Sequence, residues 1–192
     1  MIYNTILCLG DSQTYGSRDE YNRAWPFELC DMMSEEYKQN WIPIVRARPG
    51  FTSADLLRNV YNWILGINTY KVIVLIGTND AKPKVATPSI VFKKNLIGTL
   101  RTIEVLLPIA KLYLCTIPDL GIFGSPDFNK GSQQLINNFN SIISFLANRN
   151  NHISLIDLCE IPKQCYADTV HFNNSGALEI ARRVKEKIEE EY

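Results

Sequence analysis

Short apolar runs alternate along the chain with longer segments in which apolar residues recur at helical spacing. Runs that are rich in branched residues and closed by turn-forming residues predict buried strands. Five strands are expected, at residues 5–9, 41–47, 71–76, 111–116 and 153–157, of which the first is expected to be buried. The continuous run at 71–76 is typical of a strand covered on both faces. Pro43 indicates that the second strand begins there or lies at a sheet edge.

The intervening segments predict helices at about residues 25–37, 53–64, 89–107, 133–149 and 174–191. Pro26 fits the first turn of the first helix, and Thr52 or Ser53 caps the second. The second helix carries an apolar face made of Ala54, Leu57, Val60, Tyr61 and Ile64. Residues 13–23 are expected to form a polar loop. Strands that alternate with helices predict a single three-layer α/β/α domain over residues 1–192, built on a parallel sheet.

Polar residues and glycines follow four of the predicted strands, namely Ser12, Gly50, Asn79 with Asp80, and Asp168 with His171. Because the carboxyl ends of parallel strands open at one edge, we expect these residues to converge there. His152 precedes the last strand and therefore belongs to the opposite edge. Each residue also fits a local role, since serine, asparagine and aspartate are common in turns and caps. Their shared position is what favours a functional site.

Ser12, His171 and Asp168 suit nucleophilic catalysis. A serine hydroxyl is a weak nucleophile that needs a base, and imidazole, with an ordinary pKa of about 6.5, suits that task near neutrality. Asp168 is close enough in the sequence to His171 to fix the tautomer of the imidazole. The backbone N–H groups of Ser12 and Gly50 and the side-chain amide of Asn79 are candidate donors of an oxyanion hole.

Four short blocks follow one another in order: Gly10-Asp11-Ser12, Gly50, Gly77-Thr78-Asn79-Asp80, and Asp168-Thr169-Val170-His171 continued by Asn173 and Gly176. Together they resemble the SGNH hydrolase (GDSL-like lipase/esterase) superfamily. The resemblance implies Ser12 as nucleophile, His171 as base and acid, and Asp168 as the orienting carboxylate. It also implies an oxyanion hole made by Ser12, Gly50 and Asn79, and a flavodoxin-like sheet of five parallel strands in the order 2-1-3-4-5. No metal or organic cofactor is expected.

Two positions depart from the usual pattern of that superfamily. Arg46-Ala47-Arg48 stands where a second glycine is often found upstream of Gly50. Gln13 follows the Gly-Asp-Ser block in place of the commoner leucine or isoleucine. Neither departure removes a residue with a catalytic role.

The composition limits which binding partners and which cellular location we expect for the protein. The net charge of +0 gives no reason to expect a nucleic-acid partner, which usually requires a basic face. No apolar run approaches the roughly 20 residues of a membrane-spanning helix. The 5 cysteines include no Cys-x-x-Cys pair, which favours a reduced protein. With no signal-peptide pattern before the first strand, we expect a cytoplasmic location; the oligomeric state stays open.

The expected substrate is a small-molecule ester, and small or acetylated polar esters are favoured because no large apolar lid is evident. The pocket walls are expected from residues 13–23, 81–88 and 121–128. The candidate substrate-binding residues are Asp11, Tyr15, Phe123 and Phe172. The alternatives are a lysophospholipase, thioesterase or acyltransferase with the same catalytic residues, or a catalytically silent binding protein of this fold. A nucleotide- or flavin-binding domain is disfavoured, since no strand is followed by Gly-x-Gly-x-x-Gly or a P-loop.

Overall fold

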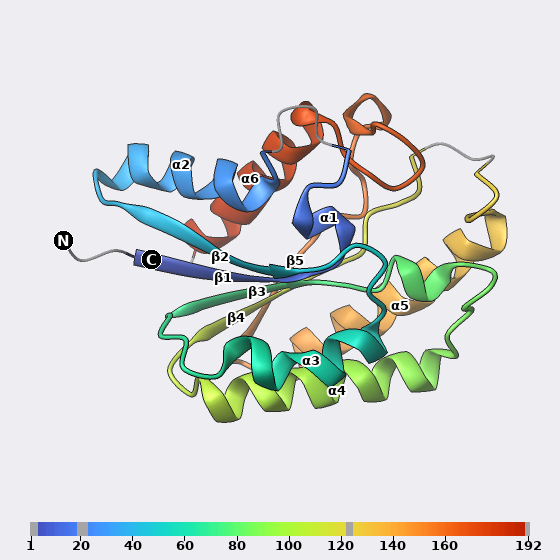
Figure 1. Cartoon of the computed structure of the whole chain (residues 1–192), viewed down its shortest axis with the longest axis horizontal. Coiled ribbons are helices and arrows are strands. Elements are labelled where there is room, and N and C mark those ends of the chain that lie inside the picture. Colours follow the sequence, from blue (N-terminus) through green and yellow to red (C-terminus); the bar gives the residue numbers. More distant parts are fainter. Residues whose placement is uncertain (1–3, 19–22, 122–124, 191–192) are drawn as a thin grey trace.

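The computed structural model describes residues 4–18, 23–121 and 125–190. Five parallel strands form one sheet in the order β2-β1-β3-β4-β5 (Figure 1). They are β1 (Asn4–Gly10), β2 (Trp41–Ala47), β3 (Lys71–Leu75), β4 (Lys111–Cys115) and β5 (Ile153–Ile156). The predicted three-layer fold and strand order are therefore confirmed, and β2, which contains Pro43, lies at an edge of the sheet.

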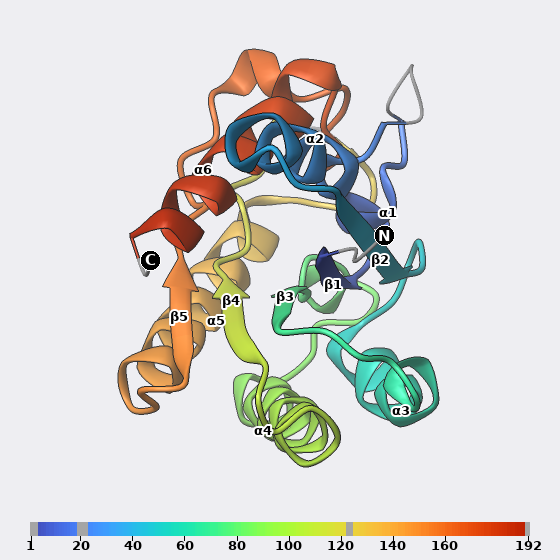
Figure 2. The same ribbon diagram turned by 90° about the vertical axis from the view of Figure 1, so that its left-hand side faces the viewer.

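Helices cover both faces of the sheet (Figure 2). One face carries α2 (Trp25–Tyr37) and α6 (Asn174–Glu189), and the other carries α3 (Ser53–Ile64), α4 (Ser89–Leu106) and α5 (Lys130–Asn148). The connections contain the short helix α1 (Ser12–Tyr15) and the 3-10 turns η1 (Asn79–Ala81) and η2 (Lys163–Cys165). Among the described residues, no helix has the length and apolar character needed to cross a membrane.

Strand β1 divides its side chains between the two layers, as the alternation of a strand requires. Ile6 and Cys8 pack with α2 and α6 in one apolar cluster, whereas Leu7 and Leu9 pack with α3, α4 and α5 in the other. All four side chains are fully buried. In β3, every residue after Lys71 is buried as well, as predicted for a strand covered on both faces. The carboxyl ends of β1 and β3 are therefore held from both sides at the centre of the sheet.

Two parts of the chain differ from the sequence-based expectations. The predicted polar loop begins with α1, which is capped by the Asp11 carboxylate through the Gln13 N–H (2.9 Å) and ended by Gly16 in the left-handed region (φ 84°). A helix of 4 residues shows no periodicity, so the pattern could not reveal it. In α3, Leu56 is fully buried while Tyr61 is 52% exposed, so the prediction that Tyr61 belongs to the apolar face was wrong.

The end of β1 approaches β3 so closely that only glycine fits. A Cβ atom at Gly10 would lie 2.4 Å from the carbonyl oxygen of Leu75 and 2.3 Å from Thr14 Oγ1. From this glycine the chain turns directly into α1 at the carboxyl end of β1, the strand that pairs with β3. This is the point where the strand order reverses, and open α/β sheets hold their ligands there.

Candidate active site

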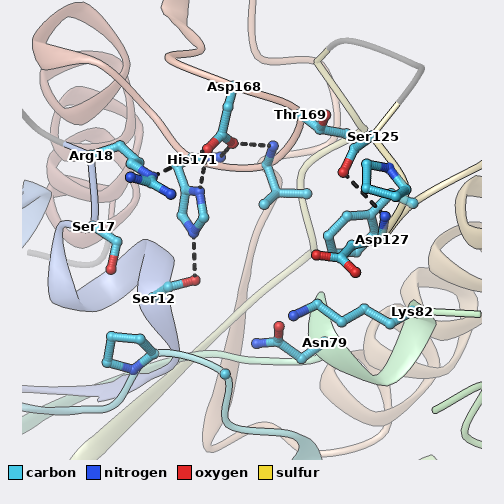
Figure 3. A pocket seen from close by; sticks show the side chains of 15 residues that line it. Ser12, Ser17, Arg18, Asn79, Lys82, Ser125, Asp127, Asp168, Thr169 and His171 are labelled. Atoms are coloured by element: carbon cyan, nitrogen blue, oxygen red, sulfur yellow. Dashed lines mark hydrogen bonds and ion pairs between the residues drawn. The ribbon is translucent and has the colours of Figure 1, made fainter. Parts of the chain in front are cut away.

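Ser12 is the first residue of α1 and follows the cap residue Asp11. The first N–H groups of any helix have no intrahelical acceptor. The residue is only 6% exposed, and its hydroxyl faces the pocket drawn in Figure 3. The turn thus presents the hydroxyl to the pocket and leaves the backbone N–H of Ser12 without a helical partner.

A continuous chain of hydrogen bonds links Ser12 to Asp168 through His171 (Figure 3). Ser12 Oγ lies 3.0 Å from His171 Nε2, and His171 Nδ1 lies 2.7 Å from Asp168 Oδ2. A ring nitrogen that faces a carboxylate carries the hydrogen, which leaves Nε2 as the acceptor for the serine hydroxyl. The fold therefore joins a serine and a histidine that are separated by 159 positions in the sequence.

Both oxygens of Asp168 accept hydrogen bonds. Oδ2 accepts from the imidazole, and Oδ1 accepts from the backbone N–H groups of Val170 and His171, each at 2.9 Å. Partial burial by itself raises the pKa of Asp168, but these hydrogen bonds outweigh burial and hold the pKa below its ordinary value. Arg18 Nε adds a positive charge 3.6 Å from Oδ2. Asp168 is therefore ionised near neutral pH and fixes the orientation of the ring.

The loop that carries His171 follows β5, which lies at the opposite edge of the sheet from β2 and is separated from β1 by two strands. The loop is held across this distance by specific hydrogen bonds. Gln13 Nε2 donates to the carbonyl oxygen of Val170 at 2.9 Å, and the Gly121 N–H donates to the carbonyl oxygen of Thr169 at 2.9 Å. The side chain of Gln13 is buried and extends from α1, so this hydrogen bond links the loop that carries His171 directly to the helix that begins at Ser12.

Gly50 and Asn79 line the pocket on the side nearest the ends of β2 and β3. Gly50 adopts φ 82°, which a side chain rarely tolerates, although nothing within 4 Å would meet a Cβ atom there. Asn79 Nδ2 donates to the carbonyl oxygen of Phe51 at 3.0 Å and, over a longer distance of 3.4 Å, to Asp11 Oδ2. The first of these contacts ties η1 to the turn that contains Gly50.

Two buried carboxylates, Asp11 and Asp80, lie behind the pocket and have no exposed surface. Burial raises the pKa of Asp11 to about 7, opposed by the hydrogen bond from the Gln13 N–H and reinforced by the charge of Asp80. Burial also raises the pKa of Asp80, although Ser53 donates to it through its N–H (2.7 Å) and its hydroxyl (2.6 Å). Asp80 thereby fastens η1 to the beginning of α3.

The pocket has a volume of about 740 Å³. It is lined by Ser12, Ser17, Arg18, Pro49, Gly50, Asn79, Lys82, Ser125, Pro126, Asp127, Phe128, Asp168, Thr169, Val170 and His171. Each of the three segments expected to form walls contributes residues to this lining. Sequence reasoning missed two cations, Arg18 and Lys82; the position of Lys82, just after the Asn79 block, was the available signal.

The residues expected to bind substrate do not converge on this lining. Asp11 has no exposed surface, so the expectation that it contacts substrate does not hold. Tyr15 is 58% exposed but lies outside the lining, and Phe172 is buried against Tyr166 with ring centroids 4.8 Å apart. Phe123 lies outside the described residues. Aromatic surface in the described lining comes instead from the loop at residues 125–128.

All five cysteines lie in the described part of the chain, and each is a free thiol. Within residues 4–18, 23–121 and 125–190, no group of three or more His, Cys, Asp and Glu side chains is arranged to hold a metal ion.

Residues 8–177 match the model of the GDSL-like Lipase/Acylhydrolase family. The chain belongs to this family. The match includes all four sequence blocks and every residue of the hydrogen-bonded chain, and membership supports a hydrolase that acts on esters. No curated protein sequence matches this family member significantly.

Solved structures of several hydrolases share the fold of this GDSL-like protein. A putative GDSL-like lipase from Parabacteroides merdae superposes with a TM-score of 0.81 at 18% identity, covering 96% of this chain and 94% of that chain. A carbohydrate acetylesterase family member from Sinorhizobium meliloti gives 0.78 at 17% identity, with 97% and 98% covered. A psychrotrophic esterase from Pseudoalteromonas sp., inhibited by monoethylphosphonate, gives 0.73 at 18%, with 97% of both chains covered. At these identities the likeness establishes the fold.

Proposed function

We propose that the protein is a serine esterase that hydrolyses carboxylic esters through an acyl-enzyme intermediate. The observation that carries the proposal is the hydrogen-bonded chain from Ser12 Oγ to His171 Nε2 (3.0 Å) and from His171 Nδ1 to Asp168 Oδ2 (2.7 Å). Nucleophile, base and orienting carboxylate in this geometry are the requirements of serine catalysis. Membership in a family of lipases and acylhydrolases supports the same chemistry.

Acylation begins when Ser12 Oγ attacks the carbonyl carbon of the ester and its proton passes to His171 Nε2. The carbonyl π electrons move to oxygen and give a tetrahedral oxyanion. When this intermediate collapses, the bond from carbon to the alkoxy oxygen breaks, and Nε2 returns the proton to that oxygen. The alcohol leaves, and the acyl group remains on Ser12. Asp168 stays ionised throughout and stabilises the imidazolium form of the ring.

Deacylation repeats these steps with water. A water molecule gives one proton to His171 Nε2 while its oxygen attacks the acyl carbon. Collapse of the second tetrahedral intermediate breaks the bond between Ser12 Oγ and carbon, and the proton on Nε2 returns to Oγ. The carboxylic acid is released, and the free enzyme is restored.

The oxyanion requires donors near Ser12, and we assign this role to the N–H groups of Ser12 and Gly50 and to Asn79 Nδ2. One hydrogen of Nδ2 donates to Phe51 at 3.0 Å, whereas the contact with Asp11 is long at 3.4 Å. The second hydrogen of Nδ2, which makes only the long contact with Asp11, is the one that we assign to the substrate oxyanion. Each well-placed donor is worth about 3 kcal/mol in the transition state.

A polar ester of small to moderate size fits the pocket best. Charged and hydroxyl side chains predominate in the lining, and Phe128 is its one aromatic residue in the described chain. Sinorhizobium meliloti supplies structural neighbours described as carbohydrate acetylesterases, which supports a polar, acetylated substrate as one candidate. Transfer of the acyl group to an alcohol uses the same residues and would appear as a new ester when sugar or alcohol acceptors are added.

The proposal is tested by hydrolysis of p-nitrophenyl acetate and butyrate. We expect turnover by the wild type and a loss of at least 10³-fold in kcat/KM for both Ser12→Ala and His171→Ala, with unchanged thermal unfolding. Turnover by Ser12→Ala within tenfold of the wild type would contradict the assigned nucleophile. A folded wild type that turns over neither ester nor natural acyl sugars and lipids would favour the silent binding protein.

A further inference from the structure

Lys82 lines the pocket but takes no part in the hydrogen-bonded chain from Ser12 to Asp168. It follows η1, and its backbone is fixed on both sides. Its N–H donates to the carbonyl oxygen of Asn79 at 3.3 Å, and its own carbonyl accepts from the N–H groups of Val85 (2.9 Å) and Ala86 (2.7 Å). The element that positions the proposed oxyanion donor therefore also positions Lys82.

The ammonium group of Lys82 extends into the pocket. Its Nζ lies 5.6 Å from the centroid of the Phe128 ring, a cation–π contact that supports the long side chain. Figure 3 shows the ammonium beside Asn79, with His171 on the far side of the pocket. In the part of the chain that the structure describes, Lys82 forms no ion pair, whereas Arg18, the other cation of the lining, lies 3.6 Å from Asp168.

The position of His171 decides which part of an ester faces Lys82. Nε2 must deliver its proton to the leaving alkoxy oxygen, so the alcohol portion lies on the side of His171. The acyl portion extends from the carbonyl carbon away from that side. Lys82, across the pocket from His171 and next to Asn79, therefore lies on the side that the acyl portion shares with the oxyanion.

We propose that Lys82 binds an anionic group at the far end of the acyl chain, so that the preferred substrates are half-esters of dicarboxylic acids. The inference rests on the proposed esterase function and deepens it. A lysine ammonium is a compact charge that suits a carboxylate, and the partly covered pocket screens the contact less than open solvent does.

Three carboxylates in or behind the pocket bear on this proposal. Asp11 and Asp80 are buried behind the pocket, and the charge of Lys82 lowers the pKa of Asp11 against the larger effect of burial. A purely structural role of Lys82, as a counter-charge to these groups, would affect all substrates alike. Asp127 lines the pocket from an exposed position, and its charge opposes an anionic acyl group. Removal of that charge should therefore favour anionic substrates further.

The test compares monoethyl succinate with ethyl butanoate, which replaces the free carboxylate by a methyl group, with ethanol release as the readout. The measured quantity is the ratio of kcat/KM for the charged ester to that for the neutral ester. We expect this ratio to fall roughly tenfold in Lys82→Met, the value of one charge-assisted contact in an accessible pocket. Lys82→Arg should retain most of the ratio, Asp127→Asn should raise it, and Lys84→Met, on an exposed neighbour outside the lining, should leave both rates unchanged.

Each remaining outcome overturns a separate claim. An unchanged ratio in Lys82→Met, or an equal fall for both esters, overturns the proposed role of Lys82, while Ser12-dependent hydrolysis of the neutral ester keeps the esterase proposal intact. If Lys82→Met loses activity only on O-acetylglycolate, whose carboxylate lies on the alcohol portion and whose hydrolysis is followed by acetate release, the placement of Lys82 on the acyl side is overturned. Absence of Ser12-dependent turnover on every ester, p-nitrophenyl acetate included, overturns the proposed function itself.

Discussion

The substitution Asp168→Asn tests the proposed mechanism at the residue that sets the tautomer of His171. Asp168 has two acceptor oxygens, of which Oδ1 receives two backbone N–H groups at 2.9 Å and Oδ2 receives the imidazole N–H at 2.7 Å. Asparagine has a single acceptor oxygen and an NH₂ group. If its oxygen faces the backbone donors, its NH₂ faces Nδ1, which must then give up its hydrogen. Nε2 then carries the hydrogen and cannot accept the proton of Ser12.

The opposite orientation of the amide is less favourable. It would place NH₂ against two backbone donors and leave both of them unpaired, at about 1–3 kcal/mol each. The orientation that gives the wrong tautomer therefore dominates. An equivalent substitution in Ser-His-Asp proteases lowers kcat by about 10⁴-fold, which corresponds to about 5.4 kcal/mol of transition-state stabilisation. We expect a loss of the same order here.

The assay is kcat for p-nitrophenyl butyrate between pH 7 and 9, together with thermal unfolding of each variant. Asp168→Asn should lose about 10⁴-fold in kcat while remaining folded, because the backbone contacts of the loop persist. Asp31→Asn, at an exposed carboxylate of α2, is the matched control and should retain full activity. A folded Asp168→Asn variant with more than a tenth of the wild-type kcat would refute the assigned role of the carboxylate.

Three further perturbations test other parts of the account. Gln13→Met removes the buried bond to Val170 and should lower kcat roughly tenfold with little change in KM; an unchanged kcat would exclude a positioning role. Burial raises the pKa of Asp11 from 3.8 to about 7, so folding takes up a proton between these values and stability falls as pH rises through this window. In urea unfolding, the free energy of unfolding of Asp11→Asn relative to that of the wild type should therefore rise by on the order of 2 kcal/mol between pH 5 and pH 8. A difference between the two proteins that does not change with pH would contradict the raised pKa. His152→Ala, at an exposed residue before β5, should leave activity intact. Inactivation of a folded His152→Ala variant would contradict the assignment of the active site to the edge of the sheet that carries His171.

The sheet could be predicted from the sequence because β1, β3, β4 and β5 are short apolar runs of mostly buried residues, whereas β2 holds only partly buried and exposed residues. The run at residues 71–76 gave β3 to within one residue, and Pro43 correctly indicated that β2 lies at an edge. Because the strands are parallel, the turns that follow them were expected to lie at one edge of the sheet. The neighbourhood of Ser12, Gly50 and Asn79 is a consequence of β2, β1 and β3 being adjacent.

Features that depend on tertiary contacts could not be predicted. The short helix α1 is capped by Asp11, and because Asp11 is fully buried its carboxylate cannot contact substrate. Phe172 suggested a pocket wall, yet its ring packs against Tyr166 in the core. The bond from Gln13 to Val170 joins residues 157 positions apart, and no local pattern signals it. Lys82 has no periodicity that marks it, and only its position just after the Asn79 block indicated that it lines the pocket.

The central claim is that Ser12 is the nucleophile, and covalent labelling tests it most directly. The folded wild type is treated with a fluorophosphonate, and the modified peptide is located by mass spectrometry, with Ser12→Ala and His171→Ala treated in parallel. We predict a single adduct on Ser12 that is absent from Ser12→Ala and forms far more slowly in His171→Ala. An adduct on another residue, or equal labelling of the wild type and His171→Ala, would contradict it.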